Sequence, residues 1–285
     1  MIFWIASYPK SGNTWLRILI SCYYYTENGL FYENVFKKIG QFPEKMHFKN
    51  FKYDQNILTD TSRFWIKAQE RINNDNKLKF FKTHNAFGAL NNNHFTDNKN
   101  SIGAIYVVRD PRNVITSLKN HYELNDDQAL KWMMNEKNFI YDVEKFKQDG
   151  YSDFQFLSSW STNLKSWKSQ KKIPIKIIKY EDLLNETYIV FKDVIEFINK
   201  TTNNKQKLDK EKLKNAVNST LFDKLKDSEQ KHGFSEAITS KKDNNKKISF
   251  FNLGPKNDWR KILDKDLQVK ISGIFEKEIN ELEYK

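Results

Sequence analysis

A chain of 285 residues with 39% hydrophobic and 15% aromatic residues is long and apolar enough for one large folded domain, which excludes a disordered chain. Basic residues exceed acidic residues by 12, so an anionic partner must be considered. However, only six of the 48 basic residues are arginines, and no long basic run occurs, which favours lysines scattered over the surface. We therefore expect no nucleic-acid partner.

The cysteine content and the N-terminal segment indicate in which cellular compartment the protein is expected. Cys22 is the only cysteine, which excludes an intrachain disulfide and a cysteine-based zinc site and favours a reducing compartment. The apolar residues 2–7 are too short for a membrane span and lack a basic leader. The sequence thus predicts a cytoplasmic protein with no membrane span, and it leaves the oligomeric state open.

Short apolar runs predict the strands of the fold. Residues 2–7, 102–108 and 173–179 are rich in strand-forming residues and are each followed by a turn, and the shorter run 78–82 predicts a fourth strand. Strands that alternate with helices predict an α/β fold, in which helices flank a parallel sheet in three layers. Ligands in such sheets bind at the carboxyl ends of the strands, so candidate site residues are sought there.

Two stripes of apolar residues predict amphipathic helices. The first stripe follows the third strand and consists of Phe191, Val194, Ile195 and Ile198. The second lies near the C-terminus and consists of Leu267, Ile271, Ile274, Phe275, Ile279 and Leu282.

Two irregular segments interrupt these elements. Residues 85–101 are rich in turn formers, and residues 239–247 are charged and polar with almost nothing to bury. We interpret the second segment as a mobile loop, extending to about residue 250, inside a single domain of residues 1–285. The motif that follows it argues against a linker.

The turn after the first strand has the composition of a phosphate site. Its sequence, YPKSGNT over residues 8–14, leads from the strand into an apolar helical run, so backbone N–H groups and the positive helix end face one point. Lys10 adds a charge, and Ser11 and Thr14 add hydroxyl donors. It is not a Walker A loop, because the lysine precedes the only glycine. On composition alone, a plain connection is equally compatible with this turn.

Residues 8–15 closely resemble the 5′-phosphosulfate-binding loop of the sulfotransferases that use 3′-phosphoadenosine 5′-phosphosulfate (PAPS). The resemblance implies a P-loop-like sheet and a transferase that binds PAPS as its cosubstrate. It also implies that Lys10 reaches the 5′-phosphate and the bridging oxygen, and that Trp15 packs near the adenine. The residues implied as the phosphate cradle are Ser11, Gly12, Asn13 and Thr14.

A second strand–turn–helix junction carries an arginine and a serine. Arg109 ends the strand at 102–108, Pro111 suits the first helical turn, and Ser117 follows about two turns later. An arginine fork with a hydroxyl suits a phosphate monoester, although by itself the pair is slightly better explained as an arginine paired with an acidic neighbour and a surface hydroxyl. In the family, an arginine and a serine with this spacing bind the 3′-phosphate. A kinase would have no use for such a site.

The fourth strand ends in a lysine and a histidine two residues apart, Lys82 and His84. Sulfuryl transfer needs a base for the acceptor proton, and histidine has a suitable pKa. It also needs fixed cations for the charge on the leaving and sulfuryl oxygens. The resemblance implies that His84 is the catalytic base, with Lys10 and Lys82 as the cations. The other histidines (His47, His94, His121 and His232) lack this context, and His121 is expected to be structural.

Two further segments complete the resemblance. Tyr180 follows the third strand, where the family often has a tyrosine that lines the nucleotide pocket, whereas Glu181 and Asp182 are expected to cap the next helix. Gly254 begins a segment that keeps the family's spacing to an Asp-Trp pair at 258–259.

Two positions in that last segment depart from the family pattern. Asn252 and Leu253 stand where the family has an Arg-Lys pair that helps to hold the 3′-phosphate, and Asn257 replaces a glycine. Lys256 or the lysines of residues 241–247 are the candidates to replace the missing cations.

The order of the motifs predicts a PAPS-dependent sulfotransferase that transfers directly, in line and without metal, to an unidentified small-molecule, glycan or lipid acceptor. A nucleotide or small-molecule kinase and a non-catalytic polyanion-binding protein remain as alternatives. Aromatic side chains of residues 31–75 are equally compatible with an acceptor pocket and with the core. These are Phe42, Phe48, Phe51, Tyr53, Phe64 and Trp65.

Overall fold

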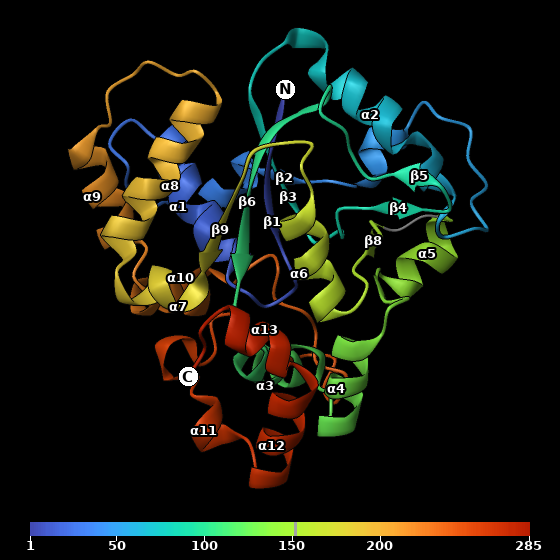
Figure 1. The fold of residues 1–285 in the computed structure, drawn as a ribbon, viewed down its shortest axis with the longest axis vertical. Helices are drawn as coiled ribbons and strands as arrows, with labels where there is room; N and C mark the ends of the chain where they lie inside the picture. Colours follow the sequence, from blue (N-terminus) through green and yellow to red (C-terminus); the bar gives the residue numbers. More distant parts are fainter. Residues whose placement is uncertain (151–152) are drawn as a thin grey trace.

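The computed structural model describes residues 1–150 and 153–285 (Figure 1). Within these residues the main sheet has five strands in the order β2-β3-β1-β6-β9, and every neighbouring pair is parallel. Its strands are β1 (Ile2–Ser7), β2 (Gly40–Gln41), β3 (Lys79–Thr83), β6 (Ser101–Val108) and β9 (Ile175–Lys179). All four predicted strands are therefore present, and β2 is an additional edge strand. Its two residues are too few to give a periodic signal.

Helices cover both faces of this sheet. The helices are α1 (Asn13–Tyr25), α2 (Trp65–Ile72), α3 (Pro111–Tyr122), α4 (Asp126–Met134), α5 (Val143–Asp149), α6 (Trp160–Ser169), α7 (Tyr180–Asn185), α8 (Thr187–Thr201), α9 (Lys210–Ser219), α10 (Phe222–His232), α11 (Trp259–Ile262), α12 (Lys265–Ile274) and α13 (Glu276–Glu281). Two small antiparallel pairs join β4 (Ala89–Leu90) to β5 (Asn93–His94) and β7 (Phe139–Ile140) to β8 (Gln155–Phe156).

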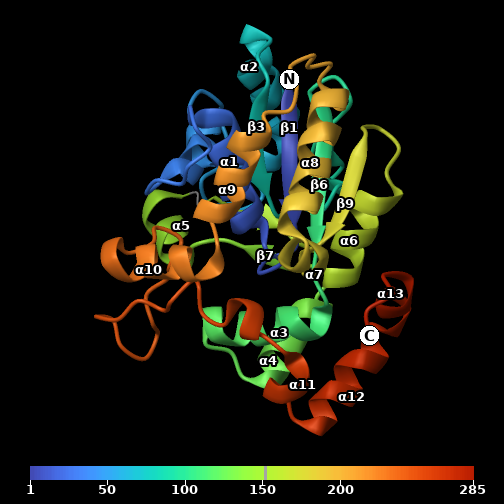
Figure 2. The ribbon, with the colours of Figure 1, turned by 90° about the vertical axis from the view of Figure 1, so that its left-hand side faces the viewer.

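The alternating side chains of β1 divide the core into two layers, as a strand buried on both faces requires. Trp4 and Ala6 face a cluster that α3, α4, α6 and α12 complete. Phe3 and Ile5 face a cluster that α1, α8 and α9 complete, with α8 contributing its whole predicted stripe. Figures 1 and 2 show α1, α8 and α9 together on one side of the sheet. The predicted three-layer α/β fold is thus confirmed.

The predicted C-terminal helix differs in detail from the observed one. It is divided into α12 and α13 at Phe275, and Ile274 of the predicted stripe is 37% exposed. The remaining members of the stripe pack on or against the core. The polar segment 239–247 folds back on itself through a bridge between Thr239 and Lys247. Its mobility stays a prediction.

The aromatic residues of 31–75 belong to the core. Phe42, Phe48 and Trp65 are fully buried, and Phe51, Tyr53 and Phe64 pack against the same cluster. Along the part of the chain that the structure describes, no helix combines the length and the apolar character needed to cross a bilayer.

Candidate active site

A cavity of about 860 Å³ lies at the carboxyl edge of the sheet, where the chain leaves β1, β3 and β6. This is where a ligand binds in parallel sheets of this kind. Residues of α3, of α10 and of the chain that follows α10 also line the cavity. Of the predicted site residues, those that line it are Lys10, Gly12, Asn13, Thr14, Trp15, Lys82, His84, Arg109, Ser117, Tyr180 and Gly254.

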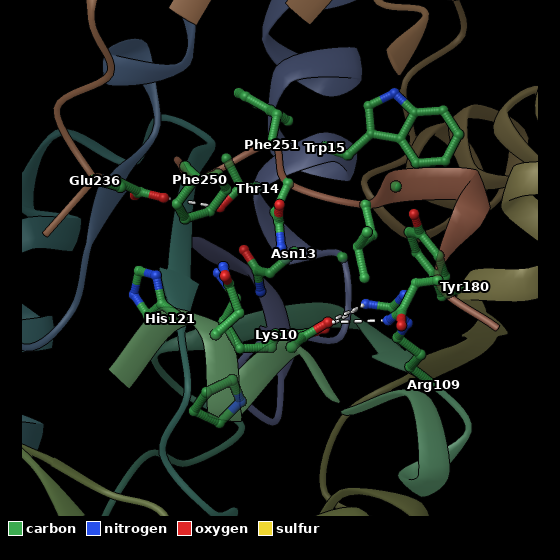
Figure 3. Close-up of a pocket in the computed structure, with 18 of the residues that line it drawn as sticks. Lys10, Asn13, Thr14, Trp15, Arg109, His121, Tyr180, Glu236, Phe250 and Phe251 are labelled. Atoms are coloured by element: carbon green, nitrogen blue, oxygen red, sulfur yellow. Dashed lines mark hydrogen bonds between the residues drawn. The ribbon is translucent and has the colours of Figure 1, made fainter. Parts of the chain in front are cut away.

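The loop after β1 is held in shape by a close aromatic contact. Gly12 has a φ of 100°, and a Cβ at this position would overlap the ring of Tyr180. Only glycine meets both requirements, so this residue sets the path of the loop. Trp15 packs edge-on against the same tyrosine, with ring centroids 6.0 Å apart, and its indole N–H donates to the Thr220 carbonyl at 3.0 Å. The two predicted nucleotide-binding aromatics therefore lie together (Figure 3).

The other members of the predicted cradle have different surroundings. The Asn13 amide donates back to the Ile5 carbonyl of β1 at 2.9 Å, which fastens the start of α1 to the sheet. Ser11 is 1% exposed and is absent from the cavity lining, and its hydroxyl has no hydrogen-bond partner among the described residues. Thr14 lines the cavity, and its hydroxyl is engaged by a residue that the sequence did not predict.

That residue is Glu236, which follows α10. Its carboxylate accepts from the Thr14 hydroxyl at 2.8 Å, from Arg17 Nη2 at 2.5 Å and from Lys82 Nζ at 3.1 Å. Although burial raises the pKa of Glu236, the charges of Lys82 and Arg17 outweigh it and hold this pKa well below its usual range. No local motif could have indicated this cluster, because Thr14 and Glu236 are 222 residues apart.

Lys10 has a left-handed backbone, with a φ of 64°, and its ammonium group lies 4.0 Å from the centroid of the Phe250 ring. Burial lowers the pKa of Lys10 to about 7, against the opposing charge of Glu236. The lysine predicted for the loop therefore lines the cavity, and its role as a cation stays a prediction.

His84 Nδ1 contacts two oxygens of Ser7, and the longer of the two contacts is with the Ser7 hydroxyl at 3.2 Å. Its Nδ1 lies 2.7 Å from the Ser7 carbonyl oxygen, which can only accept, so Nδ1 carries the proton. Nε2 is then unprotonated in the neutral ring. Burial, aided by the positive charge of Lys82, lowers the pKa of His84 to about 3. The imidazole is consequently neutral at physiological pH, and its pKa differs from the near-neutral value on which the sequence-based choice of histidine as base depended.

Arg109 and Ser117, which the sequence predicts to bind the 3′-phosphate, lie next to each other in the cavity wall. Arg109 Nη1 donates to the Ser117 hydroxyl at 3.1 Å and to the Lys10 carbonyl at 3.1 Å, so it also joins the two predicted phosphate sites. Its guanidinium carbon lies 4.3 Å from the centroid of the Tyr180 ring. Arg109 is 7% exposed, and its Nε has no partner among the described residues. A buried guanidinium with a free donor suits an anion.

Asn257, which replaces a family glycine, ties this side together. Its amide nitrogen donates to the Ser117 hydroxyl at 3.1 Å and to the Asn113 carbonyl at 3.0 Å, and its oxygen accepts from Thr116 at 2.6 Å. Gly254, with a φ of 51°, presses against the ring of Phe222, where a Cβ would overlap. The departure from the family pattern at 257 is therefore compatible with an ordered site.

Several lysines lie near Asn252 and Leu253, the two positions that lack the family's cations. Lys226 of α10 donates to the Asn252 carbonyl at 3.3 Å. Lys256, which the sequence suggested, is exposed and does not line the cavity. In the 241–247 loop, Lys241 donates to the Tyr122 carbonyl and Lys247 to the Ala237 carbonyl. Lys226 does not line the cavity either, so none of these lysines takes the place of the missing cations in the lining.

His121, expected to be structural, lies in the cavity wall beside Phe250, with ring centroids 5.8 Å apart (Figure 3). Burial and the charge of Lys10 lower the pKa of His121 to about 3. Across residues 1–150 and 153–285, no group of three or more histidine, cysteine, aspartate or glutamate side chains is arranged to hold a metal ion.

Comparison with known proteins places this site in a family. A family model described as the sulfotransferase domain matches residues 2–283. Luciferin sulfotransferase of Photinus pyralis is 26% identical over 79% of this chain and 56% of its own length. Sulfotransferase 1A1 of Rattus norvegicus is 23% identical over 99% of this chain and 85% of its own length.

Solved structures share the fold. Retinol dehydratase, crystallised with androsterone and the inactive cofactor PAP, superposes with a TM-score of 0.58 and 15% identity, over 98% of this chain and 80% of that one. A mouse sulfotransferase complexed with PAP superposes with a TM-score of 0.53 and 18% identity, over 98% of this chain and 83% of that one. The prediction of a PAPS-dependent sulfotransferase is confirmed by the family match, and the chain belongs to the sulfotransferase family.

Proposed function

We propose that this chain transfers the sulfuryl group of PAPS to a hydroxyl or amine of a small-molecule, glycan or lipid acceptor, with His84 as general base. The observation that carries the proposal is the hydrogen bond from His84 Nδ1 to the Ser7 carbonyl, in a cavity that also holds Lys10 and Lys82. This bond leaves Nε2 as the lone-pair nitrogen of a neutral ring. A base must be in that state before it takes a proton from an attacking acceptor.

Lys10 and Lys82 supply the positive charge that the reaction requires. Both line the same cavity as His84: Lys10 lies in the loop after β1, and Lys82 lies in the neighbouring strand β3. Negative charge grows on the bridging oxygen as the sulfur–oxygen bond breaks, and fixed cations stabilise it most strongly in a site that excludes water. We assign Lys10 to the bridging oxygen and Lys82 to the sulfuryl oxygens.

The nucleotide occupies the remainder of the cavity. We assign the 3′-phosphate to Arg109, Ser117 and the neighbouring Asn257 network, and the adenine to the aromatic cluster around Trp15, Tyr180 and Phe222. Two anion sites separated by an aromatic surface fit a nucleotide phosphorylated at both its 3′ and 5′ positions. The family match and this pair of sites together favour a sulfotransferase over the kinase and the polyanion-binding alternatives.

The acceptor side of the cavity is mixed in chemistry. Gln41, Tyr141, Asp142, Ile140 and Gln155 line it, so polar and apolar groups both face the acceptor. The retinol dehydratase structures hold androsterone or retinol, which are small-molecule ligands. This lining supports a small acceptor that carries polar groups, and it gives no preference between a hydroxyl and an amine nucleophile.

A radiolabelled transfer screen tests the proposal. The protein is incubated with PAPS labelled in the sulfuryl group and with sets of phenols, alcohols, amines, lipids and glycans, in parallel with the His84→Ala variant. We expect label to appear on at least one acceptor with the wild-type chain and to fall by two or more orders of magnitude with the variant. Equal labelling by both chains would contradict the general-base assignment, and adenosine-triphosphate-dependent phosphate transfer instead would contradict the donor assignment.

A further inference from the structure

Glu236 places a carboxylate on groups that the proposed function assigns to the donor. The Thr14 hydroxyl belongs to the predicted phosphate cradle, and Lys82 is a predicted catalytic cation, yet both donate to Glu236. Arg17, one helical turn beyond Thr14, donates to the same carboxylate at 2.5 Å. Glu236 itself lines the cavity, as Figure 3 shows for its contact with Thr14.

The chain that carries Glu236 also covers the second cation. Residues 233–251, here called the cap segment, run from the end of α10 to the ring of Phe250, which lies over the ammonium of Lys10 at 4.0 Å. Phe250 and Glu236 thus engage Lys10 and Lys82 from one segment. Glu229 of α10 anchors the same segment at its other end by accepting from the backbone N–H groups of Phe250 and Phe251 at 2.6 and 2.8 Å.

A buried cation cluster must be neutralised, because an unpaired charge away from water carries a large desolvation cost. Arg17 is 3% exposed and Lys82 is 8% exposed. A carboxylate and a phosphosulfate offer these groups the same chemistry, namely negatively charged oxygens that accept from a hydroxyl, an ammonium and a guanidinium. One site cannot satisfy both anions at once.

We propose that the Glu236 carboxylate is a built-in competitor of the donor's 5′ anion: in the nucleotide-free chain it accepts from Thr14 and neutralises Arg17 and Lys82, and it is displaced when the donor binds. The proposal rests on the proposed function, since it assigns the displaced contacts to that donor. Because Glu236 must first leave, the apparent affinity for the donor equals the intrinsic affinity multiplied by the fraction of chains in which Glu236 is already displaced. It also favours ligands with a 5′ anion, because only such a ligand replaces the charge that Glu236 withdraws.

The experiment measures the affinity of two nucleotides by calorimetry in the wild-type chain and in Glu236→Gln. Adenosine 3′,5′-bisphosphate carries both anions, whereas adenosine 3′-monophosphate lacks the 5′ anion that competes with Glu236. We expect Glu236→Gln to bind the bisphosphate about tenfold more tightly than the wild type, since a charge-assisted contact no longer has to be broken. The affinity for the 3′-monophosphate should change less than twofold.

Glu229→Gln is the matched control, because it loosens the cap segment while the Glu236 contacts stay in place. If loosening alone raised the affinity, both variants would bind both nucleotides more tightly, and that result would overturn the proposal. Weaker binding of both nucleotides by Glu236→Gln would overturn it too, because it would show that Glu236 only anchors the cap segment. Glu236→Asp keeps the negative charge on a shorter side chain. Its affinity for the bisphosphate should therefore lie between that of the wild type and that of Glu236→Gln.

The same titrations separate this inference from the proposed function, and melting curves check that each variant is folded. We expect Glu236→Gln to melt at a lower temperature than the wild type and to gain more from the bisphosphate, because its cations lack a partner until the ligand binds. A wild-type chain that binds the bisphosphate no better than the 3′-monophosphate would contradict the donor assignment itself. A wild-type chain that binds it well, with no gain in the variant, would contradict the Glu236 proposal alone.

Discussion

The two anion sites of the cavity are built in different ways. The 5′ side is built mainly on one local segment: residues 8–12, between β1 and α1, supply the lysine and the glycine, and α1 supplies the helix end. Lys82 and His84 are added from β3 and the residue after it, and Glu236 and Phe250 from the chain that follows α10. The 3′ side is assembled from distant segments, since Arg109 ends β6, Ser117 lies in α3 and Asn257 follows the 3₁₀ turn at Gly254–Lys256.

This difference determines how each site tolerates change. A local loop depends on its own sequence, and Gly12 has no substitute because its φ and the Tyr180 ring both exclude a side chain. A site assembled from distant segments can exchange one partner for another. Asn257 stands where the family has a glycine, and its amide bonds Ser117 and Asn113. We therefore expect substitutions on the 5′ side to lower kcat or nucleotide affinity more than substitutions on the 3′ side.

The largest expected effect is that of His84→Ala on the 5′ side. Loss of a general base lowers kcat by roughly 10²–10⁴, whereas affinity for adenosine 3′,5′-bisphosphate should stay nearly unchanged because His84 is proposed to act on the acceptor and not on the nucleotide. Initial rates with one working acceptor and calorimetric titrations give the two quantities. His121→Ala removes another buried histidine from the same cavity and is the comparison, with an expected loss below tenfold. A similar loss in both variants would assign His84 a structural role.

The next effect comes from Lys10 and depends on pH. Its pKa is lowered to about 7, and an anion binds the protonated form, so affinity is full below this pH and falls as pH rises through it. Between pH 7 and 9, where the nucleotide phosphates are already ionised, affinity for the bisphosphate should fall by up to about tenfold per pH unit. Titrations at several pH values measure this, and Lys10→Met should bind weakly with a flat profile. If the affinity of the wild-type chain for the bisphosphate did not depend on pH, the assignment of Lys10 to the donor's 5′ anion would be wrong.

The smallest effect is expected on the 3′ side. Asn257→Gly restores the family residue but removes the bonds to Ser117, Asn113 and Thr116, so affinity for adenosine 3′,5′-bisphosphate should fall about fivefold, the value of one ordinary hydrogen bond. Affinity for adenosine 5′-monophosphate (AMP) should not change. An unchanged affinity for the bisphosphate would show that Asn257 is only a spacer. A loss as large as that of a 5′-side variant would remove the contrast between the two sides.

The same contrast explains what could be predicted from sequence. The strands at 2–7 and 102–108, with the turns after them, are contiguous in sequence, so composition and periodicity were enough to predict them. The contacts of Glu236 and Asn257 bring together residues more than a hundred positions apart, and no local pattern encodes such a meeting. Burial decided the role of Phe42 and Trp65, because an aromatic side chain suits a core and a pocket equally well until the packing is known.

The measurement that tests the central claim most directly is a comparison of adenosine 3′,5′-bisphosphate with AMP by calorimetry on the wild-type chain. The two ligands differ only in the 3′-phosphate that Arg109 and Ser117 are proposed to hold. A charge-assisted hydrogen bond contributes roughly 1.5–3 kcal/mol, so the bisphosphate should bind about one to two orders of magnitude more tightly. Equal affinities would mean that the cavity has no 3′-phosphate site, and they would contradict the assignment of PAPS as donor in this chain.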